Sequence, residues 1–388
     1  MEVTRAQALA LRLRAHHLDR RLPPEQWRAA MRPVGLRTTV PDGAVMSLHA
    51  RAEGATGDEL ATALAARELV EVRAGHGYLI LPPDDVTAFT LGSLPAGEAA
   101  LRAKLGRLRA ALDAGRSAGE AVELAHAAAV DALADGPLGG SELSAAMTRR
   151  LPAELSPYCR ACATHHVDQT LHGFAALRGA HAKVPGDDGI ALADQVLGRP
   201  VPRRSGARLA REMRAARDEL ARRFLRAHAP ADARDLAWWL VVPEPDAAAT
   251  LDRLAGELVP VTYAGRRCWV HADDEAALQA APSVDGVRLL PPYDPLLTTH
   301  DRAAIAPSEA AERLLWRVVA NSGVVLADGE VVAAWRGRKG GRRQLEVAVT
   351  PFVRWPARRW RPVVAEAAAL APLRGCAEAA VSIGEPVS

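Results

Sequence analysis

Apolar positions recur at helical spacing near the start of the chain. Over residues 5–20 they fall at Ala6, Leu9, Leu13 and Leu18, which predicts an amphipathic helix. Two prolines open the next segment, LPPEQWRAAMR, as they often do in the first turn of a helix. A third short helix is predicted in AVMSLHARAEG. The N-terminal region is therefore predicted to be helical.

A helix followed by a β-hairpin is predicted directly afterwards. Thr56 and Glu59 have capping-box spacing at the start of a helix that runs to Arg67. LVEVRA is a predicted strand, residues 75–77 form a glycine-rich turn, and YLILP is the returning strand. A helix leading into a hairpin that ends in Pro-Pro-Asp-Asp is typical of the wing end of a winged helix.

The same order of helix and hairpin recurs twice. Residues 136–152 predict a turn and a helix, and LHGFAALRGAHAKV supplies the closing part of that unit. Residues 219–275 contain two helical stretches before LVPVTY and CWVHA, which flank a turn at 264–267. Three weakly similar units indicate an internal repeat. The alternative is that alanine-rich helices resemble one another by chance.

The C-terminal part of the chain has a different pattern. GVRLLPPYDPLL, SGVVLADGEVVAAWRGRK and RRQLEVAVTPF are strand-like, and they are followed by the helix RRWRPVVAEAAALAPLRG and the strand AEAAVSIG. We therefore predict an α+β fold of about three tandem winged-helix units followed by a β-rich C-terminal domain. The predicted boundaries are 1–100 for the N-terminal helices and first winged helix, 101–218 for the second unit with helical connections, 219–285 for the third winged helix, and 286–388 for the β-rich domain.

Length and composition agree with this division. A chain of 388 residues exceeds one compact core, and 49% apolar with 24% charged residues is globular composition. Four cysteines do not make a disulfide framework. No run of about 18 apolar residues occurs, and the N-terminal segment lacks the apolar run of a signal peptide. We expect a soluble, cytoplasmic, monomeric protein without membrane contact.

Arginine is clustered although the net charge is only +3. RPVPRRSGARLAREMRAAR, WRGRKGGRR and RWPARRWRP are rich in arginine, and two of them contain tryptophan. Local basic faces suit polyanions such as double-stranded DNA. The alternative is that arginine merely replaces lysine, since Lys104, Lys183 and Lys339 are the only lysines.

Several stretches together resemble a known family. They are LRAHHLDRR with VMSLHARAEG, then GPLGGSEL, DLAWWL, LLPPYDPLLTTHDR and ADGEVVAAWRGRK, in the family's order. With them the chain resembles the AlkZ/YcaQ family of winged-helix DNA glycosylases, which act on alkylated purines and interstrand crosslinks. The resemblance implies tandem winged helices around duplex DNA, a monofunctional glycosylase reaction, and no metal or redox cofactor.

The resemblance also points to a site at residues 35–39. An alkylated purine leaves readily, so hydrolysis needs chiefly a positioned water and stabilisation of the sugar cation. The family carries Gln-x-Gln or Gln-x-Asp after a Gly-Leu pair, whereas this chain has Arg37 and Thr39 after Gly35-Leu36. Arginine stays protonated in proteins and cannot act as a base, and a threonine hydroxyl is a poor base.

This departure leaves several hypotheses open. In our main hypothesis Arg37 contacts a phosphate and the protein binds DNA without cutting the glycosidic bond. In the second it is an active glycosylase, for repair or self-resistance, in which Thr39 with Asp42 or His49 holds the water. A vestigial site, a different ligand, or a non-enzymatic transcriptional regulator are further alternatives.

Candidate DNA contacts lie in the turn, in the helix after it and in the C-terminal region. They are Arg37, His49, Arg51, Arg302, Arg336, Arg338, Lys339 and Arg342. The last four belong to WRGRKGGRR, whose glycines suit the tip of a basic hairpin laid along a groove. A solvated loop is the alternative there.

One further stretch, YCRACATHHV, has the spacing of half a zinc site. Cys159, Cys162 and His165 supply three potential ligands. No second CxxC is present, Cys268 and Cys376 lie far away in sequence, and the resembled family needs no metal. We therefore expect no cofactor.

Overall fold

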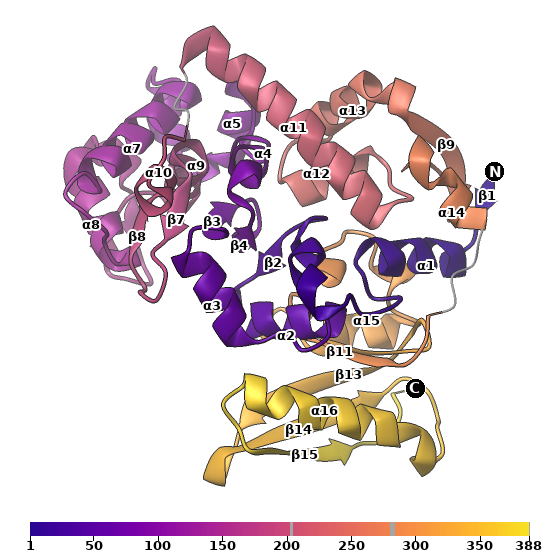
Figure 1. Ribbon diagram of the computed structural model, residues 1–388. Coiled ribbons are helices and arrows are strands. Elements are labelled where there is room, and N and C mark those ends of the chain that lie inside the picture. The colour runs from indigo at the N-terminus through magenta and orange to yellow at the C-terminus, as the bar shows by residue number, and fades with distance from the viewer. Residues whose placement is uncertain (202–204, 280–283, 388) are drawn as a thin grey trace. The chain divides into compact units, whose positions relative to one another are not determined.

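The computed structural model describes residues 1–201, 205–279 and 284–387 (Figure 1). Two compact units are present, and each is assembled from segments that are distant in sequence. The segments of the first, which we call the terminal unit, are Met1–Leu60, Arg222–Asp235 and Ala255–Ser388. The segments of the second, which we call the central unit, are Ala61–Ala221 and Leu236–Leu254.

The terminal unit contains most of the strands. Its helices are α1 (Arg5–Ala15), α2 (Gly43–Arg51), α14 (Glu275–Gln279), α15 (Glu309–Leu315) and α16 (Arg361–Leu373). Its strands are β1 (Glu2–Val3), β2 (Leu36–Arg37), β9 (Leu258–Tyr263), β10 (Arg266–His271), β11 (Val287–Leu290), β12 (Gly323–Ala327), β13 (Glu330–Lys339), β14 (Gln344–Pro351) and β15 (Glu378–Ile383). LPPEQWRAAMR, predicted as a helix, forms a 3-10 helix over Pro24–Met31.

A five-stranded sheet forms the core of the C-terminal region, in the order β11-β12-β13-β14-β15. The first four strands are antiparallel, and β15 runs parallel to β14 after the crossover through α16. Asp328 and Gly329 have positive φ values of 49° and 82°, as a two-residue hairpin turn requires. The apolar face of α16, including Val363 and Leu370, packs on this sheet. The predicted strands and helix are thus confirmed here.

Helix α1 and the hairpin β9–β10 form a second layer of the terminal unit. Strand β1 pairs in parallel with β9, and β10 pairs antiparallel with it. Leu9 and Leu13 are buried, as their helical spacing predicts. The turn at Ala264 and Gly265 has the positive φ values expected of the predicted hairpin.

The central unit is mainly helical. Its helices are α4 (Val86–Leu91), α5 (Glu98–Lys104), α6 (Arg109–Asp113), α7 (Ala118–Ala132), α8 (Gly140–Arg150), α9 (Gln169–Gly179), α10 (Ala193–Leu197) and α13 (Glu244–Arg253). Its strands are β3 (Val70–Ala74), β4 (Gly77–Leu81), β5 (Tyr158–Cys159), β6 (Thr164–His165), β7 (His181–Lys183) and β8 (Ile190–Leu192). Three helices run from one unit into the other, namely α3 (Gly57–Ala65), α11 (Gly206–His228) and α12 (Ala233–Leu240).

The central unit joins two predicted hairpins into one sheet. Strands β3 and β4 pair antiparallel, β7 and β8 do the same, and Val72 pairs with Ala182 between them. Leu143 of α8 and Leu171 of α9 are fully buried in the core formed with α7. The sharing of one sheet by two hairpins was not predicted from the sequence.

The mixed α+β class is confirmed by these elements. The Thr56–Glu59 capping box is also present, since the Glu59 backbone N–H donates to Thr56 Oγ1 at 3.2 Å and Thr56 N–H donates to Glu59 Oε2 at 3.0 Å. The four predicted domain boundaries stay a prediction. Within the described residues no helix combines the length and hydropathy that crossing a bilayer requires.

Candidate nucleic-acid interface

The segment from Gly35 to Gly43 contains the short strand β2 and a turn that leads into α2. Gly35 and Asp42 have φ values of 72° and 60°, so the chain reverses at both ends. A Cβ on Gly43 would lie 2.8 Å from Val40 Cγ2, closer than real contacts allow. A larger residue at this position would force the Val40 side chain to shift, so the turn lies closely against the start of α2.

The polar side chains of this turn contact one another. The Arg37 guanidinium donates from Nε and Nη2 to Thr39 Oγ1, each at 3.3 Å. Thr39 is exposed and Arg37 is half-buried. The carboxylate of Asp42 faces Arg374, with 3.5 Å between Oδ2 and Nε. The turn thus presents a fixed cation beside a hydroxyl, and its carboxylate is directed to a second arginine.

Arg51 is a correction to the predicted DNA contacts. Its side chain is only 1% exposed, and its Nη1 and Nη2 donate to the two Asp294 carboxylate oxygens at 2.8 and 2.7 Å. The Ser47 hydroxyl donates to the same carboxylate at 2.7 Å. A buried, bidentate ion pair of this kind has no surface left for a phosphate. Arg51 is therefore structural, and predicting it as a DNA contact was wrong.

His49, on the same helix, also faces the protein interior. Its Nε2 lies 3.6 Å from Glu366 Oε1, and Arg21 donates to the same carboxylate. Burial, together with the charges of Arg21 and Arg288, lowers the pKa of His49 to about 4. His49 is therefore neutral near pH 7, so it cannot neutralise a phosphate as a cation.

This cluster was not predicted from the sequence. Burial raises the pKa of Glu366, although Arg21 and Arg288 act in the opposite direction. Arg288 is 9% exposed and donates to its neighbouring backbone carbonyl, Val287 O, at 2.9 Å. Arg21 and Glu366 are 345 positions apart, so no local pattern could have signalled their contact.

The β13–β14 hairpin carries three of the predicted contacts on its surface. Arg336, Arg338 and Lys339 are exposed, and Arg336 and Arg338 lie two residues apart, so they share one face of the strand. Arg338 forms a 2.5 Å ion pair with Glu346, across the ladder. A hollow of about 740 Å³ lies beside these arginines. The side chain of Arg342 lies outside the described residues.

Arg302 is engaged within the protein. Its guanidinium lies 3.7 Å from Glu312 and 5.3 Å from the centre of the Trp316 ring. Its proposed DNA contact stays a prediction. The neighbouring Asp301 pairs with Arg12 at 2.8 Å.

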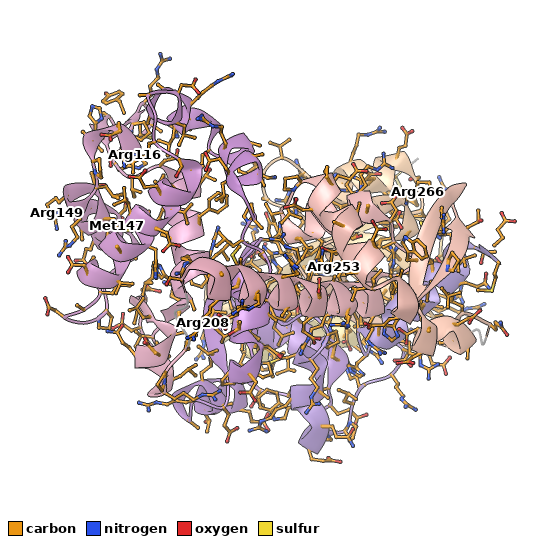
Figure 2. The ribbon with its side chains drawn as sticks, turned by 90° about the horizontal axis from the view of Figure 1, so that it is seen from above. Arg116, Met147, Arg149, Arg208, Arg253 and Arg266 are labelled. Atoms are coloured by element: carbon orange, nitrogen blue, oxygen red, sulfur yellow. The ribbon has the colours of Figure 1, made fainter. Side chains whose placement is uncertain are left out.

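Many other arginines also have carboxylate partners, so composition alone overstates the basic surface. Arg116 pairs with Glu120 at 2.8 Å, and Arg253 pairs with Asp218 at 2.5 Å. Figure 2 labels both arginines. Arg149 and Arg208 are exposed on α8 and α11. Residues 202–204, part of the first basic stretch, lie outside the described residues.

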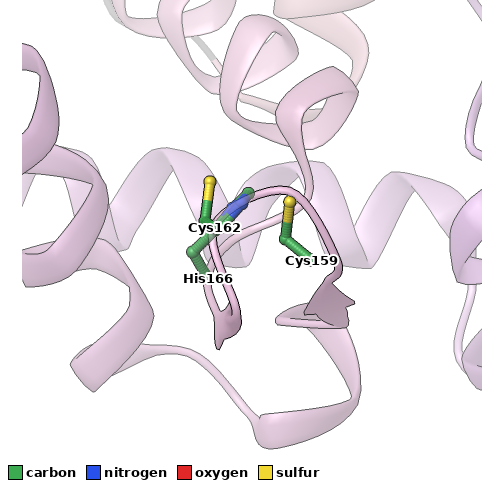
Figure 3. A group of neighbouring side chains, drawn as sticks. All are labelled: Cys159, Cys162 and His166. Carbon is green, nitrogen blue, oxygen red and sulfur yellow. The ribbon is translucent and has the colours of Figure 1, made fainter.

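The cysteine stretch forms a small hairpin in the central unit, with β5 and β6 as its strands. Cys159, Cys162 and His166 come together there (Figure 3). His165, the predicted ligand, is directed elsewhere, because its Nδ1 lies 3.0 Å from Ser156 O. The backbone N–H of Cys162, with His166, lowers the pKa of the Cys159 thiol to about 6. The histidine of this group is thus His166.

Comparison with known proteins agrees with the fold and the order of these elements. The family model described as DNA glycosylase AlkZ-like matches residues 31–373. This chain therefore belongs to the AlkZ-like DNA glycosylase family, and the resemblance predicted from the sequence is confirmed.

A solved structure gives the same result for the fold. The chain is similar to the Streptomyces sahachiroi DNA glycosylase AlkZ, with a TM-score of 0.74 and 22% sequence identity. The match covers 99% of this chain and 100% of that one. A search of curated proteins found no match.

Proposed function

We propose that this protein binds duplex DNA, and that Arg37 and Thr39 occupy the positions at which the family holds its hydrolytic water. The observation that carries the proposal is the contact of the Arg37 guanidinium with Thr39 Oγ1, 3.3 Å from both Nε and Nη2. A guanidinium cannot accept the proton of an attacking water, and it disfavours a developing sugar cation beside it. The segment suits a phosphate better than a hydrolytic water.

The two groups that the glycosylase hypothesis uses in place of the missing base have other partners. Asp42 is directed to Arg374, and His49 to Glu366 and Arg21. With a pKa of about 4, His49 is a weak base. These contacts support DNA binding without base excision as the main function.

We further propose three winged-helix units as the framework for DNA binding. In the second, α7 precedes the single bridge between Leu138 and Ile190, and α8, α9 and the hairpin β7–β8 follow. The third has the order α11, a bridge between Ala231 and Trp269, α12, α13 and β9–β10. The first begins at β2 and continues with α2, α3 and β3–β4. This order of elements supports the unit count.

The contact surface that we propose combines the Arg37 turn with the β13–β14 hairpin. Arg37 precedes the N-terminal end of α2, where the helix dipole also favours anions. Arg336, Arg338 and Lys339 are exposed cations on a hairpin. Such side chains bind phosphates without reading sequence, so we expect strong salt dependence.

An active glycosylase is the second candidate, and membership of the AlkZ-like family favours it. The decisive experiment measures base release from duplex DNA carrying N7-alkylguanine. It compares wild type with Thr39→Ala and with the double variant Arg37→Gln/Thr39→Gln, which restores two amides. We expect no release by wild type and measurable release by the double variant, because two amides can again hold a water.

Binding of the same duplex serves as the control for this assay. If wild type releases the base and Thr39→Ala abolishes the release, the protein is a glycosylase and our main proposal is wrong. If wild type does not bind duplex DNA at low salt, both candidate functions fail. The double variant must also bind the duplex, because a variant that does not bind DNA would release no base for that reason alone.

A further inference from the structure

The segment that connects α8 to α9 forms a hairpin with no counterpart in the other helix–hairpin units of the described chain. Tyr158 pairs with His165, and Cys159 pairs with Thr164. Ala163 closes the turn with a φ of 52°. This geometry brings residue 166 back beside residue 159, so that three sulfur- and nitrogen-bearing side chains meet although they come from both sides of the turn.

The three side chains point to one place. One ligand atom from each of Cys159, Cys162 and His166 lies within 4.8 Å of the others. The two sulfur atoms and the imidazole ring gather on the same side of the hairpin (Figure 3). In a tetrahedral site with Zn–S bonds of about 2.3 Å, two sulfurs are about 3.8 Å apart. Small side-chain rotations therefore suffice to close these atoms around one ion.

A hydrogen bond presets the orientation of the histidine. His166 Nδ1 lies 2.8 Å from Val167 O, so this nitrogen carries the proton and donates. The other nitrogen, Nε2, then keeps its lone pair for a metal. Zinc-binding histidines commonly hold their free N–H on a backbone carbonyl in this way. His165 instead has its Nδ1 within hydrogen-bond distance of Ser156 O. Its ring lies edge-on to the ring of Tyr158, the residue with which it pairs across the hairpin.

The same hairpin leads directly into the start of α9. The backbone N–H of Val167 donates to Thr148 Oγ1 of α8 at 2.9 Å. Asp168 then caps α9 by accepting from Thr170 N and Leu171 N at 3.0 and 3.1 Å. An ion held by residues 159–166 would therefore fix the segment that orients both helices of the proposed second winged helix.

We propose that Cys159, Cys162 and His166 bind one Zn²⁺, with a water or an external ligand in the fourth position. Two thiolates and an imidazole select zinc over Mg²⁺ or Ca²⁺, which prefer oxygen ligands. Both cysteines are free thiols, and Cys162 is exposed, so an ion can enter from solvent. The proposal does not depend on the DNA chemistry of the turn at residues 35–43.

The test is metal analysis of the full chain, reduced with a non-thiol reductant, incubated with Zn²⁺ and then desalted. We expect about one zinc per chain in wild type. Cys162→Ser and His166→Ala are expected to lose it, while the neighbouring His165→Ala retains it. Far-UV circular dichroism checks that each variant is folded, and replacement by Co²⁺ gives a second readout through thiolate-to-cobalt charge-transfer absorption.

Several outcomes would overturn the proposal. If wild type holds no stoichiometric zinc after incubation, the proposed site does not exist. If Cys162→Ser keeps the zinc, the metal is bound elsewhere and the proposal is wrong. Loss of zinc in His165→Ala but not in His166→Ala would mean that the ligand set is wrong. A Cys159–Cys162 disulfide that forms in air and a reduced form that binds no Zn²⁺ would assign the pair to redox chemistry instead.

Discussion

The two ends of helix α2 carry arginines that look alike in sequence and differ completely in the structure. Arg37 ends the short strand β2 before the helix, is half-buried, and contacts the hydroxyl of the exposed Thr39 two residues away. Arg51 ends the helix, where it is buried against Asp294, 243 positions further along the chain. Local sequence suggests a DNA contact for both, but only the distant partner decides which arginine faces solvent.

The contrast continues in the neighbouring side chains. At the start of α2, Asp42 has an arginine partner on a partly exposed surface. Towards the other end, His49 lies in a cluster with Glu366 and Arg21, and Arg51 forms the buried ion pair with Asp294. The N-terminal end of the helix thus lies near a partly exposed surface, and the C-terminal end is buried against charged partners.

The largest effect is expected from Arg51→Ala. The change leaves the Asp294 carboxylate buried without its ion-pair partner, which costs about 3 to 5 kcal/mol of the free energy of unfolding. Urea denaturation measures it. The double variant Arg51→Met/Asp294→Leu removes both charges and is expected to regain most of the loss. If Arg51→Ala lowers the free energy of unfolding by less than about 1 kcal/mol, Arg51 behaves like a surface cation and the contrast with Arg37 is wrong.

The double variant Arg336→Ala/Arg338→Ala tests the surface arginines of β13. We expect weaker binding to duplex DNA and a salt dependence whose slope falls by about two, with unchanged unfolding free energy. Fluorescence anisotropy at several salt concentrations measures both. Arg313→Ala is the matched control, because Arg313 is also exposed and paired with a glutamate, Glu309. Equal slopes for all three proteins would exclude the hairpin from the interface.

His49→Gln tests the buried end of α2 through pH. The folded protein lowers the pKa of His49 to about 4, against about 6.5 in an unfolded chain. Between these values only the unfolded state binds the proton, so stability is complete above about pH 6.5 and is lost as pH falls towards 4. The raised pKa of Glu366 acts with the opposite sign and offsets part of this loss.

Urea denaturation at about pH 7 and pH 5 isolates the contribution of His49. We expect wild type to lose on the order of 1 kcal/mol more than His49→Gln between these two conditions. The other buried histidines are common to both proteins, so they cancel in the difference. Equal losses would mean that His49 does not lie in an environment that excludes its charged form.

Arg37→Ala is expected to have only a small effect on stability. Its contacts with Thr39 lie at the surface, so the free energy of unfolding should change by less than about 0.5 kcal/mol. DNA binding should weaken, with a salt slope lower by about one if Arg37 holds a phosphate. Unchanged affinity at low salt would show that the turn does not contact DNA, although the fold is intact.

Local pattern predicted the elements of this fold well. Strand-like stretches such as VEVRA and GYLIL, with a glycine turn between them, need only neighbouring residues to specify a hairpin. The family was also recognisable, because its motifs lie in order along the whole chain. Local pattern does not predict the pairing of β3 with β7, because only one residue pair joins these strands and its two residues are more than a hundred positions apart in sequence.

The side-chain environments were less predictable than the backbone. Local sequence predicts Arg51 and His49 as surface groups, because their partners Asp294 and Glu366 lie hundreds of positions away. Sequence spacing predicts His165 as the histidine beside the cysteines, whereas the structure brings His166 there, for a different reason. In a strand, neighbouring side chains point to opposite faces, and only the register of β5 with β6 decides which histidine faces the cysteines.

The Arg51–Asp294 pair can form only after both residues have been synthesised. The two residues are 243 positions apart. A ribosome adds about 5 to 20 residues per second, so Arg51 waits roughly 12 to 50 s for its partner. Throughout that interval α2 carries a cation without the carboxylate that later buries it. The segment around α2 therefore cannot complete this buried pair until synthesis has passed Asp294.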